Sequence, residues 1–179
     1  MKRKKTGVSG GRAQWTVSRL RAMEMSRVRE LFTTLEAPEM AEMNGEYEGC
    51  LLDHGNYVVN LVSLIFLSNP ISGWWLGKAF KTLGARSGYG YNWYVKKGQV
   101  TRGFHMRTEI TQSGFDGRPS FRLIYAHYRS LYGNLGMVDE IRRLSEGVYL
   151  GVGMLRGSRM DMTRASPFVL CGPVGPFVT

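Results

Sequence analysis

Apolar and polar residues alternate through the middle of the chain. The alternation covers residues 89–95, 100–110 and 121–128, where every second side chain is mostly aromatic or aliphatic. A period of two is the pattern of a β-strand with one buried face. Lys97-Gly98 and Asp116-Gly117 lie between these segments and are typical of turns. The sequence therefore predicts a series of antiparallel strands with short connections.

A helical period precedes the strands. From Thr16 onward, apolar residues recur every three or four positions, which predicts one amphipathic helix. The helix is expected to end before Pro38, because the residue before proline is disfavoured in the α region. A short helical turn is predicted over residues 39–43, closed by Asn44-Gly45. The apolar face of the long helix comprises Leu20, Met23, Val28, Leu31 and Leu35.

The remaining segments complete an all-β (mainly β) fold. Residues 46–52 are predicted to form the first strand, and residues 148–155 and 167–171 the last ones. Residues 57–83 are ambiguous and fit a strand followed by a loop and a short helix. The chain has 23 glycines and an aromatic fraction of 12%, and glycine allows strands to bend. These features favour a barrel or a sandwich after the N-terminal α-helix.

Positive charge is concentrated near the N-terminus. The net charge is +10, and residues 1–31 hold nine Lys or Arg but only two acidic residues. We predict that residues 1–14 form a disordered basic leader and that residues 15–179 form a single domain. The leader leaves open weak binding to nucleic acid or to an anionic membrane. The strands show no clear basic stripe with interleaved aromatic residues, so no dedicated nucleic-acid site is predicted.

The sequence predicts neither export nor insertion into a membrane. No apolar segment follows the charged start of the chain, which argues against a signal peptide. The most apolar segment, residues 57–68, is too short to cross a bilayer. We therefore expect no transmembrane segment and a cytoplasmic location. Cys50 and Cys171 are expected to be free thiols, although a disulfide between them stays open.

Familiar catalytic and cofactor motifs do not occur in the sequence. It contains no nucleophile elbow, Walker loop, zinc-binding histidine pair or dinucleotide fingerprint, so neither a metal nor a cofactor is predicted. His54, His105 and His127 are too far apart for a metal-binding pair on one helix. Two of them could converge inside a barrel, and otherwise each is a surface or hydrogen-bonded imidazole.

The alternating segments place aromatic side chains on shared faces. Such a face is either ordinary core packing or the lining of a cavity, because eight strands enclose space for side chains or one small ligand. By parity Arg102 and His127 share these faces. Arg102 either binds the polar end of a ligand or lies at the rim in water. The predicted ligand-binding residues are Tyr47, Tyr91, Trp93, Arg102, Phe104, Phe121, Tyr125 and His127.

Several short motifs occur in an order that resembles a known family. Residues 45–49, Gly-Glu-Tyr-Glu-Gly, have the form G-x-aromatic-x-G directly after a predicted helical turn. This resembles the opening of lipocalin-like barrels and, more closely, the GXWXG family of bacterial proteins with its companion domain of unknown function. Residues 74–80, 128–129, 139–143 and 149–151 are similar to later segments of that family.

The resemblance covers most of residues 40–172 and implies a lipocalin-like (calycin-type) antiparallel β-barrel. It implies no reaction. Tyr47 stands where the family has tryptophan, and Leu76 interrupts the second motif. The charged residues 139–143 form either a cluster at a barrel mouth or a solvated turn or strand edge.

Three functions remain open from the sequence. The first is binding of an apolar small molecule, lipid-, terpenoid- or polyketide-like, inside the barrel. The second is a cofactor-independent isomerase, cyclase or hydratase that acts on a hydrophobic substrate in the same cavity. The third is weak binding of nucleic acid or anionic membranes through the leader, and a homodimer is also left open. The candidate catalytic residues are His105, His127, Tyr125, Asp139 and Glu140.

Overall fold

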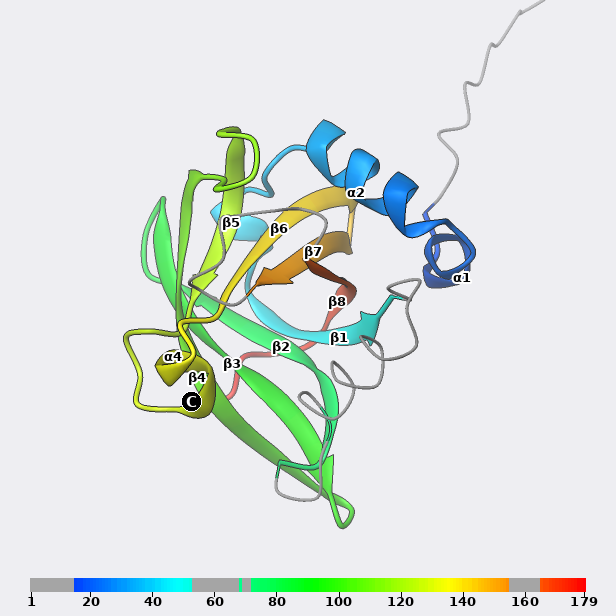
Figure 1. The fold of residues 1–179 in the computed structure, drawn as a ribbon. Coiled ribbons are helices and arrows are strands. Elements are labelled where there is room, and N and C mark those ends of the chain that lie inside the picture. The colour runs from blue at the N-terminus through cyan, green and yellow to red at the C-terminus, as the bar shows by residue number, and fades with distance from the viewer. Residues whose placement is uncertain (1–14, 53–67, 69–71, 155–164) are drawn as a thin grey trace, which may run out of the picture.

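Eight antiparallel strands close into a barrel (Figure 1). In the computed structural model, which describes residues 15–52, 68, 72–154 and 165–179, each strand pairs with the strands before and after it. Pairing of β1 with β8 completes the ring. This confirms the predicted mainly-β barrel with an N-terminal helix. The strands are β1 (Gly45–Leu51), β2 (Trp74–Thr82), β3 (Ser87–Lys96), β4 (Gln99–Gln112), β5 (Pro119–Ile124), β6 (Val138–Ser145), β7 (Val148–Met154) and β8 (Ser166–Gly175).

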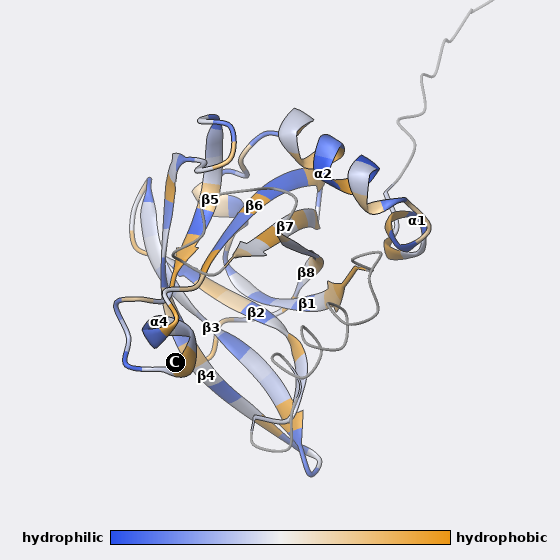
Figure 2. Cartoon of the chain, viewed as in Figure 1, coloured by the Kyte–Doolittle hydropathy of each residue, from blue (hydrophilic) through white to orange (hydrophobic). Residues whose placement is uncertain are grey.

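The two faces of the barrel wall carry two separate hydrophobic clusters. Alternate residues of the strands point into the barrel, where Tyr47, Phe80 and Phe121 belong to the interior cluster. The outward residues Leu150 of β7 and Val169 of β8 belong to the second cluster. Hydrophilic and hydrophobic residues accordingly alternate along the ribbons of the barrel (Figure 2).

Two short helices pack on the outer face of β7 and β8. α1 (Val17–Arg21) and α2 (Met25–Thr34) contribute Leu20 and Phe32, respectively, to the outer cluster. The prediction of one continuous helix is wrong, because the backbone is extended at Glu24, where α2 begins. The break lets each helix turn its apolar residues onto the curved barrel wall.

A turn of 3-10 helix packs against the interior cluster next to β1. η1 (Met40–Glu42) lies within the predicted helical turn and contributes to that cluster together with the methionine that follows it. The Tyr47 hydroxyl donates a hydrogen bond to the Glu42 carbonyl, which fixes η1 to β1. Gly45 joins the two elements with a φ of +115°. A Cβ there would lie 2.5 Å from the Gly175 carbonyl oxygen, so the position requires glycine.

Two segments differ from the sequence prediction. β5 ends at Ile124 rather than continuing through His127. The Tyr128 amide donates to the Tyr125 carbonyl, and this turn leaves His127 outside the strand and exposed to solvent. The chain then enters α4 (Leu131–Asn134), which leads to β6.

The end of the ambiguous segment 57–83, which also fitted a short helix, is strand β2. This segment pairs with β1 on one side and with β3 on the other, so barrel closure decides its conformation. The predicted leader (residues 1–14) and nearly all of the apolar segment 57–68 lie outside the described residues, as does His54.

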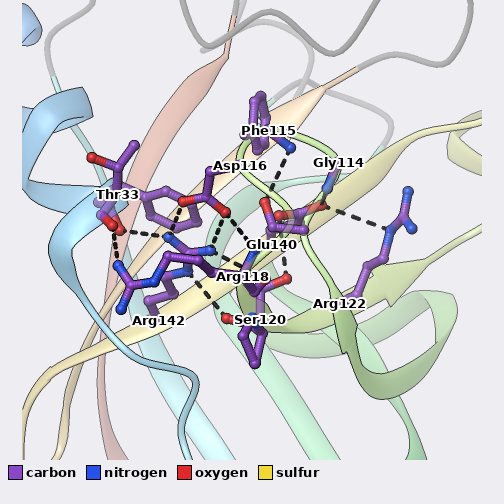
Figure 3. A network of polar contacts seen from close by, with 12 residues as sticks. Thr33, Gly114, Phe115, Asp116, Arg118, Ser120, Arg122, Glu140 and Arg142 are labelled. Atoms are coloured by element: carbon purple, nitrogen blue, oxygen red, sulfur yellow. Dashed lines mark hydrogen bonds and ion pairs between the residues drawn. The ribbon is translucent and has the colours of Figure 1, made fainter.

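β6 buries Asp139, Glu140 and Arg142, so the expectation of a solvated turn or strand edge is wrong for these three charged residues. Arg142 is fully buried on the outer face of the barrel (Figure 3). Its guanidinium binds both carboxylate oxygens of Asp116, at 2.6 and 2.7 Å, and the Phe32 carbonyl at 3.0 Å. It also donates to the carbonyls of Arg118 and Pro119 at 3.3 Å. One side chain therefore joins α2, the β4–β5 loop and β6.

Glu140 fixes the same loop from a second point. Its carboxylate accepts hydrogen bonds from the Gly114 amide at 2.8 Å and from the Ser120 hydroxyl at 3.2 Å. Arg122 lies 3.9 Å from the same carboxylate (Figure 3). The outer charges of β6 are thus paired beneath the loop rather than exposed to water, as buried charges require.

We predict that Arg142→Met lowers the free energy of unfolding by about 3 kcal/mol, because it leaves Asp116 and several carbonyls without their donor. Arg143→Met is the matched control. The Arg143 side chain is 46% exposed and binds Glu42 at 3.0 Å, so its loss should cost less than about 1 kcal/mol. Urea unfolding measures both variants, and equal costs would contradict the structural role of Arg142.

The ion pair between Arg142 and Asp116 predicts that the fold loses stability in acid. The Arg142 guanidinium holds the pKa of Asp116 below its ordinary value of 3.8. A carboxyl whose pKa is lower in the folded state stabilises the fold above its unfolded pKa, and this contribution disappears as pH falls through the folded pKa. The stability difference between wild type and Asp116→Asn should therefore be constant down to about pH 5 and shrink towards pH 2. Urea unfolding across this range tests it, and a difference that does not change with pH would contradict the assignment.

Candidate functional site

A lysine points into the barrel from β2. Lys78 is almost completely buried, with 2% of its side chain exposed. The register between β2 and β3 shifts between Trp75 and Gly77, which is the signature of a β-bulge. The bulge aims both Trp75 and Lys78 at the interior, although their spacing of three would otherwise place them on opposite faces.

The Lys78 ammonium has three acceptors, one for each of its N–H groups. Its Nζ lies 2.7 Å from the Tyr125 hydroxyl, 2.9 Å from Asn92 Oδ1 and 2.9 Å from Asp139 Oδ2. The Asp139 side chain is only 1% exposed. The three partners come from β3, from the residue after β5 and from β6. We call these four residues the interior polar cluster.

Hydrogen bonds within the cluster connect the partners to one another. The Tyr125 hydroxyl donates to Asp139 Oδ2 at 2.9 Å, and the Asn92 amide donates to that hydroxyl at 3.3 Å. Asn92 also donates to the Phe104 carbonyl and accepts from the Trp75 indole at 3.2 Å. Every donor of the cluster thus has an acceptor, as buried polar groups require.

Aromatic rings surround the ammonium on the remaining sides. Lys78 Nζ lies 5.2 Å from the centre of the Phe168 ring, 5.5 Å from that of Tyr125 and 5.6 Å from that of Trp75. A cation over aromatic faces is stabilised by the ring quadrupoles, more so where water is excluded. The cluster therefore combines a desolvated ion pair with an apolar lining.

Burial shifts the pKa values of the cluster in opposite directions. Desolvation lowers the pKa of Lys78, while the neighbouring Asp139 carboxylate acts to raise it. Desolvation and the same carboxylate raise the pKa of Tyr125 well above its ordinary value. Tyr125 therefore stays protonated at neutral pH and acts as a donor to Asp139.

One oxygen of Asp139 has no hydrogen-bond partner. Oδ1 is buried and accepts no hydrogen bond from the described part of the chain, whereas Oδ2 takes both Lys78 and Tyr125. Oδ1 faces Gly153 of β7, where a Cβ would lie only 2.8 Å away. The absence of a side chain at Gly153 is what leaves room for the carboxylate on this side.

The structure brings four of the predicted ligand-binding residues into the interior. Tyr47, Phe121 and Tyr125 belong to the interior cluster, and Phe104 packs against it. Phe104 also stacks on Tyr132 of α4, with 4.3 Å between ring centres. These aromatic side chains line the same space as the interior polar cluster.

The structure separates three other predicted residues from this site. The Tyr91 hydroxyl donates to Glu46 on the outer face, at 2.9 Å, and accepts from the Val178 amide at 3.0 Å. Arg102 pairs with the same Glu46 at 2.8 Å. The Trp93 indole donates to a β1 carbonyl at 3.1 Å. A one-residue bulge between β3 and β4 accompanies this arrangement, and the charge that faces the interior is Lys78 instead of Arg102.

The candidate catalytic residues are divided in the same way. Tyr125 and Asp139 meet in the interior polar cluster. His105 is exposed and packs against the outer-face Tyr91, with 6.3 Å between ring centres. His127 is exposed, and Glu140 lies on the outer face of β6.

The sequence interpretation missed Lys78 and Asn92 as site residues. Lys78 was visible only as part of the family-like segment 74–80, where nothing marks a lysine as buried. Asn92 belongs to the residues that alternate with Tyr91 and Trp93 in segment 89–95, and only the latter were predicted to bind a ligand. The bulge beside Gly77 and the pairing of β3 decide both orientations, and neither follows from local sequence.

Three further findings concern the sequence predictions. Cys50 of β1 and Cys171 of β8 are free, half-buried thiols. Among the residues that the structure describes, no helix is long and apolar enough to cross a membrane. Over the same residues, acidic, histidine and cysteine side chains form no group of three that could hold a metal ion.

Comparison with known proteins supports the fold alone. A crystal structure of a protein from Thermomonospora curvata superimposes with a TM-score of 0.60 at 18% sequence identity. The match covers 83% of this chain and 87% of that chain. No protein-family model and no curated protein sequence matches.

We predict that Lys78 and Asp139 stabilise the fold as a pair. Lys78→Met and Asp139→Leu should each lower the free energy of unfolding by about 3–5 kcal/mol, because each leaves a buried charge uncompensated. The double variant should lose less than the two single losses combined, since it removes both charges. Urea unfolding of the four proteins gives the coupling energy.

The exposed pair Arg27 and Glu30 of α2 provides the control cycle, with 69% and 64% of the side chains exposed. Its coupling energy should stay below about 1 kcal/mol. Additive losses at Lys78 and Asp139 would show that the interior ion pair does not act as a unit.

Proposed function

We propose that the barrel binds an apolar small molecule in its interior, next to the interior polar cluster. The observation that carries this proposal is the buried Asp139 carboxylate in an aromatic surrounding, with one oxygen that has no hydrogen-bond partner among the described residues. Binding sites for small molecules combine an apolar lining with a few polar groups that fix orientation. We further propose that the fold is lipocalin-like, and that the ligand is lipid-, terpenoid- or polyketide-like.

The composition of the interior supports binding of an apolar ligand. The ring of Phe168 and the indole of Trp75 meet edge to face, with 6.2 Å between their centres, beside the polar cluster. On β7 the interior face carries Tyr149, and the glycines of the same face make room for the Phe168 ring at Gly151 and for the Asp139 carboxylate at Gly153. Aromatic walls of this kind are suited to apolar molecules.

A second candidate function is acid–base catalysis in the same place. Tyr125 and Asp139, two of the residues expected to act in a cofactor-independent isomerase or cyclase, lie 2.9 Å apart in the interior, and both contact the buried Lys78. Titratable groups in a desolvated site are typical of general acid–base catalysis. An enzyme of this kind still requires an apolar substrate in the interior, so the binding experiment tests the step that both functions share.

Native mass spectrometry of the purified protein is the direct test of binding. We expect a mass above that of the chain alone, which organic extraction removes and releases as a small apolar compound. The neutral fluorescent probe N-phenyl-1-naphthylamine should then bind to the extracted and refolded protein. A protein that carries no extractable compound and does not bind the probe would overturn the proposal.

A glycine variant locates the bound probe. Gly153→Val adds a branched side chain to the interior face of β7, where its Cβ would lie 2.8 Å from Asp139 Oδ1 and displace that carboxylate, and it should weaken probe binding about tenfold. Gly84→Val is the matched control, because a Cβ at Gly84 meets no atom within 4 Å and the residue is exposed. Thermal unfolding of both variants checks that the barrel is intact. Equal affinities would place the probe outside the interior.

A further inference from the structure

With respect to the described residues, the four side chains of the interior polar cluster have one open hydrogen-bonding position, and its chemistry restricts the ligand. All three N–H groups of Lys78 are used by Asn92, Tyr125 and Asp139. The Tyr125 hydroxyl gives its hydrogen to Asp139 Oδ2. The open position is Asp139 Oδ1, which can accept a hydrogen bond and cannot donate one while Asp139 is ionised.

We infer that the interior ligand is a neutral molecule with a hydroxyl group, which donates a hydrogen bond to Asp139 Oδ1. This inference rests on the proposed function and adds the chemical class of the ligand. Fatty alcohols, terpenoid alcohols and phenols belong to the class. Long-chain carboxylates do not, although they would be the expected ligands if a free cation faced the interior.

The charge balance of the cluster supports this restriction. Lys78 and Asp139 compensate each other at 2.9 Å, and their side chains are 2% and 1% exposed. A bound carboxylate would add a second negative charge beside Asp139, with no uncompensated cation to receive it. Repulsion between charges is strong where water is excluded. A hydroxyl group adds no charge and supplies the donor that Oδ1 lacks.

Two other cations, Arg102 and Arg142, do not face the interior. Arg102, which the sequence indicated as a possible anchor for a carboxylate, pairs with Glu46 on the outer face. Arg142 is buried against Asp116, also outside the barrel. Within the described residues, the interior polar cluster therefore contains a single cation, Lys78, and that cation is already saturated.

Ligands of equal chain length test the inference on the wild-type protein. We would measure displacement of N-phenyl-1-naphthylamine by 1-decanol, by decanoate and by the methyl ether of decanol at pH 7.5. The alcohol should displace the probe at a concentration at least about tenfold lower than either competitor, because only the alcohol is both neutral and a donor. The ether controls for polarity without a donor, and decanoate controls for charge.

Two variants of adjacent buried acids test the role of Asp139. Asp139→Asn removes the negative charge and leaves Lys78 uncompensated, so the preference should reverse and decanoate should displace the probe better than decanol. Glu140→Gln is the matched control, because Glu140 is also buried on β6 but binds Gly114 and Ser120 on the outer face. Its preference for the alcohol should equal that of wild type.

The outcomes separate this inference from the proposed function. If decanoate or the ether displaces the probe from the wild-type protein as readily as decanol does, the inference is overturned. Binding in the interior would still stand. Absence of probe binding in the wild type would overturn both. Should Asp139→Asn fail to fold, the comparison of the three ligands on the wild-type protein still decides the question.

Discussion

The buried ion pair between Lys78 and Asp139 is the interaction on which the barrel interior depends. Moving two charges out of water costs more than their mutual attraction returns unless further hydrogen bonds complete their surroundings. Asn92, Tyr125 and the aromatic rings around Lys78 provide these surroundings. Because Lys78, Asn92 and Asp139 come from β2, β3 and β6 and Tyr125 follows β5, the complete set of contacts can form only when these strands are all in register.

β6 illustrates how strictly this register is fixed. Its residues point alternately inward and outward, so Asp139 binds Lys78 inside while Glu140 and Arg142 bind the β4–β5 loop and α2 outside. A slip by one residue would exchange the two faces and leave several charges without partners. Charged networks on both faces of β6 therefore specify one register with the neighbouring strands. Apolar side chains would distinguish this register from a shifted one less strongly. The outer network also explains why α2 is needed, since its Phe32 covers Arg142 and accepts a hydrogen bond from it.

More of the fold than of the candidate site could be predicted from the sequence. Alternation in residues 89–95 and 100–110 identified β3 and β4, and Asn44-Gly45 marked the start of β1, because these signals are local. The interior position of Lys78 depends on a bulge, and that of Asn92 on the register of β3 against its neighbours. The assumption that every second residue faces the interior fails at these register shifts. For this reason the sequence placed Arg102 rather than Lys78 on the interior face. The sequence indicated Asp139 as a candidate catalytic residue. Its burial, however, follows only from partners that are distant in the sequence.

Closure of the barrel between β1 and β8 has a consequence for how the chain acquires its structure. Cys50 pairs with Val169, so the two strands that seal the ring stand at opposite ends of the described sequence. Contacts of such long sequence separation form late, because the entropy of closing a large loop opposes them until most of the chain is ordered. During synthesis on the ribosome, β1 therefore waits with an unpaired edge until the last strand has emerged. The outer cluster under α1 and α2 includes residues of β7 and β8, so the helices too can dock only at this final stage.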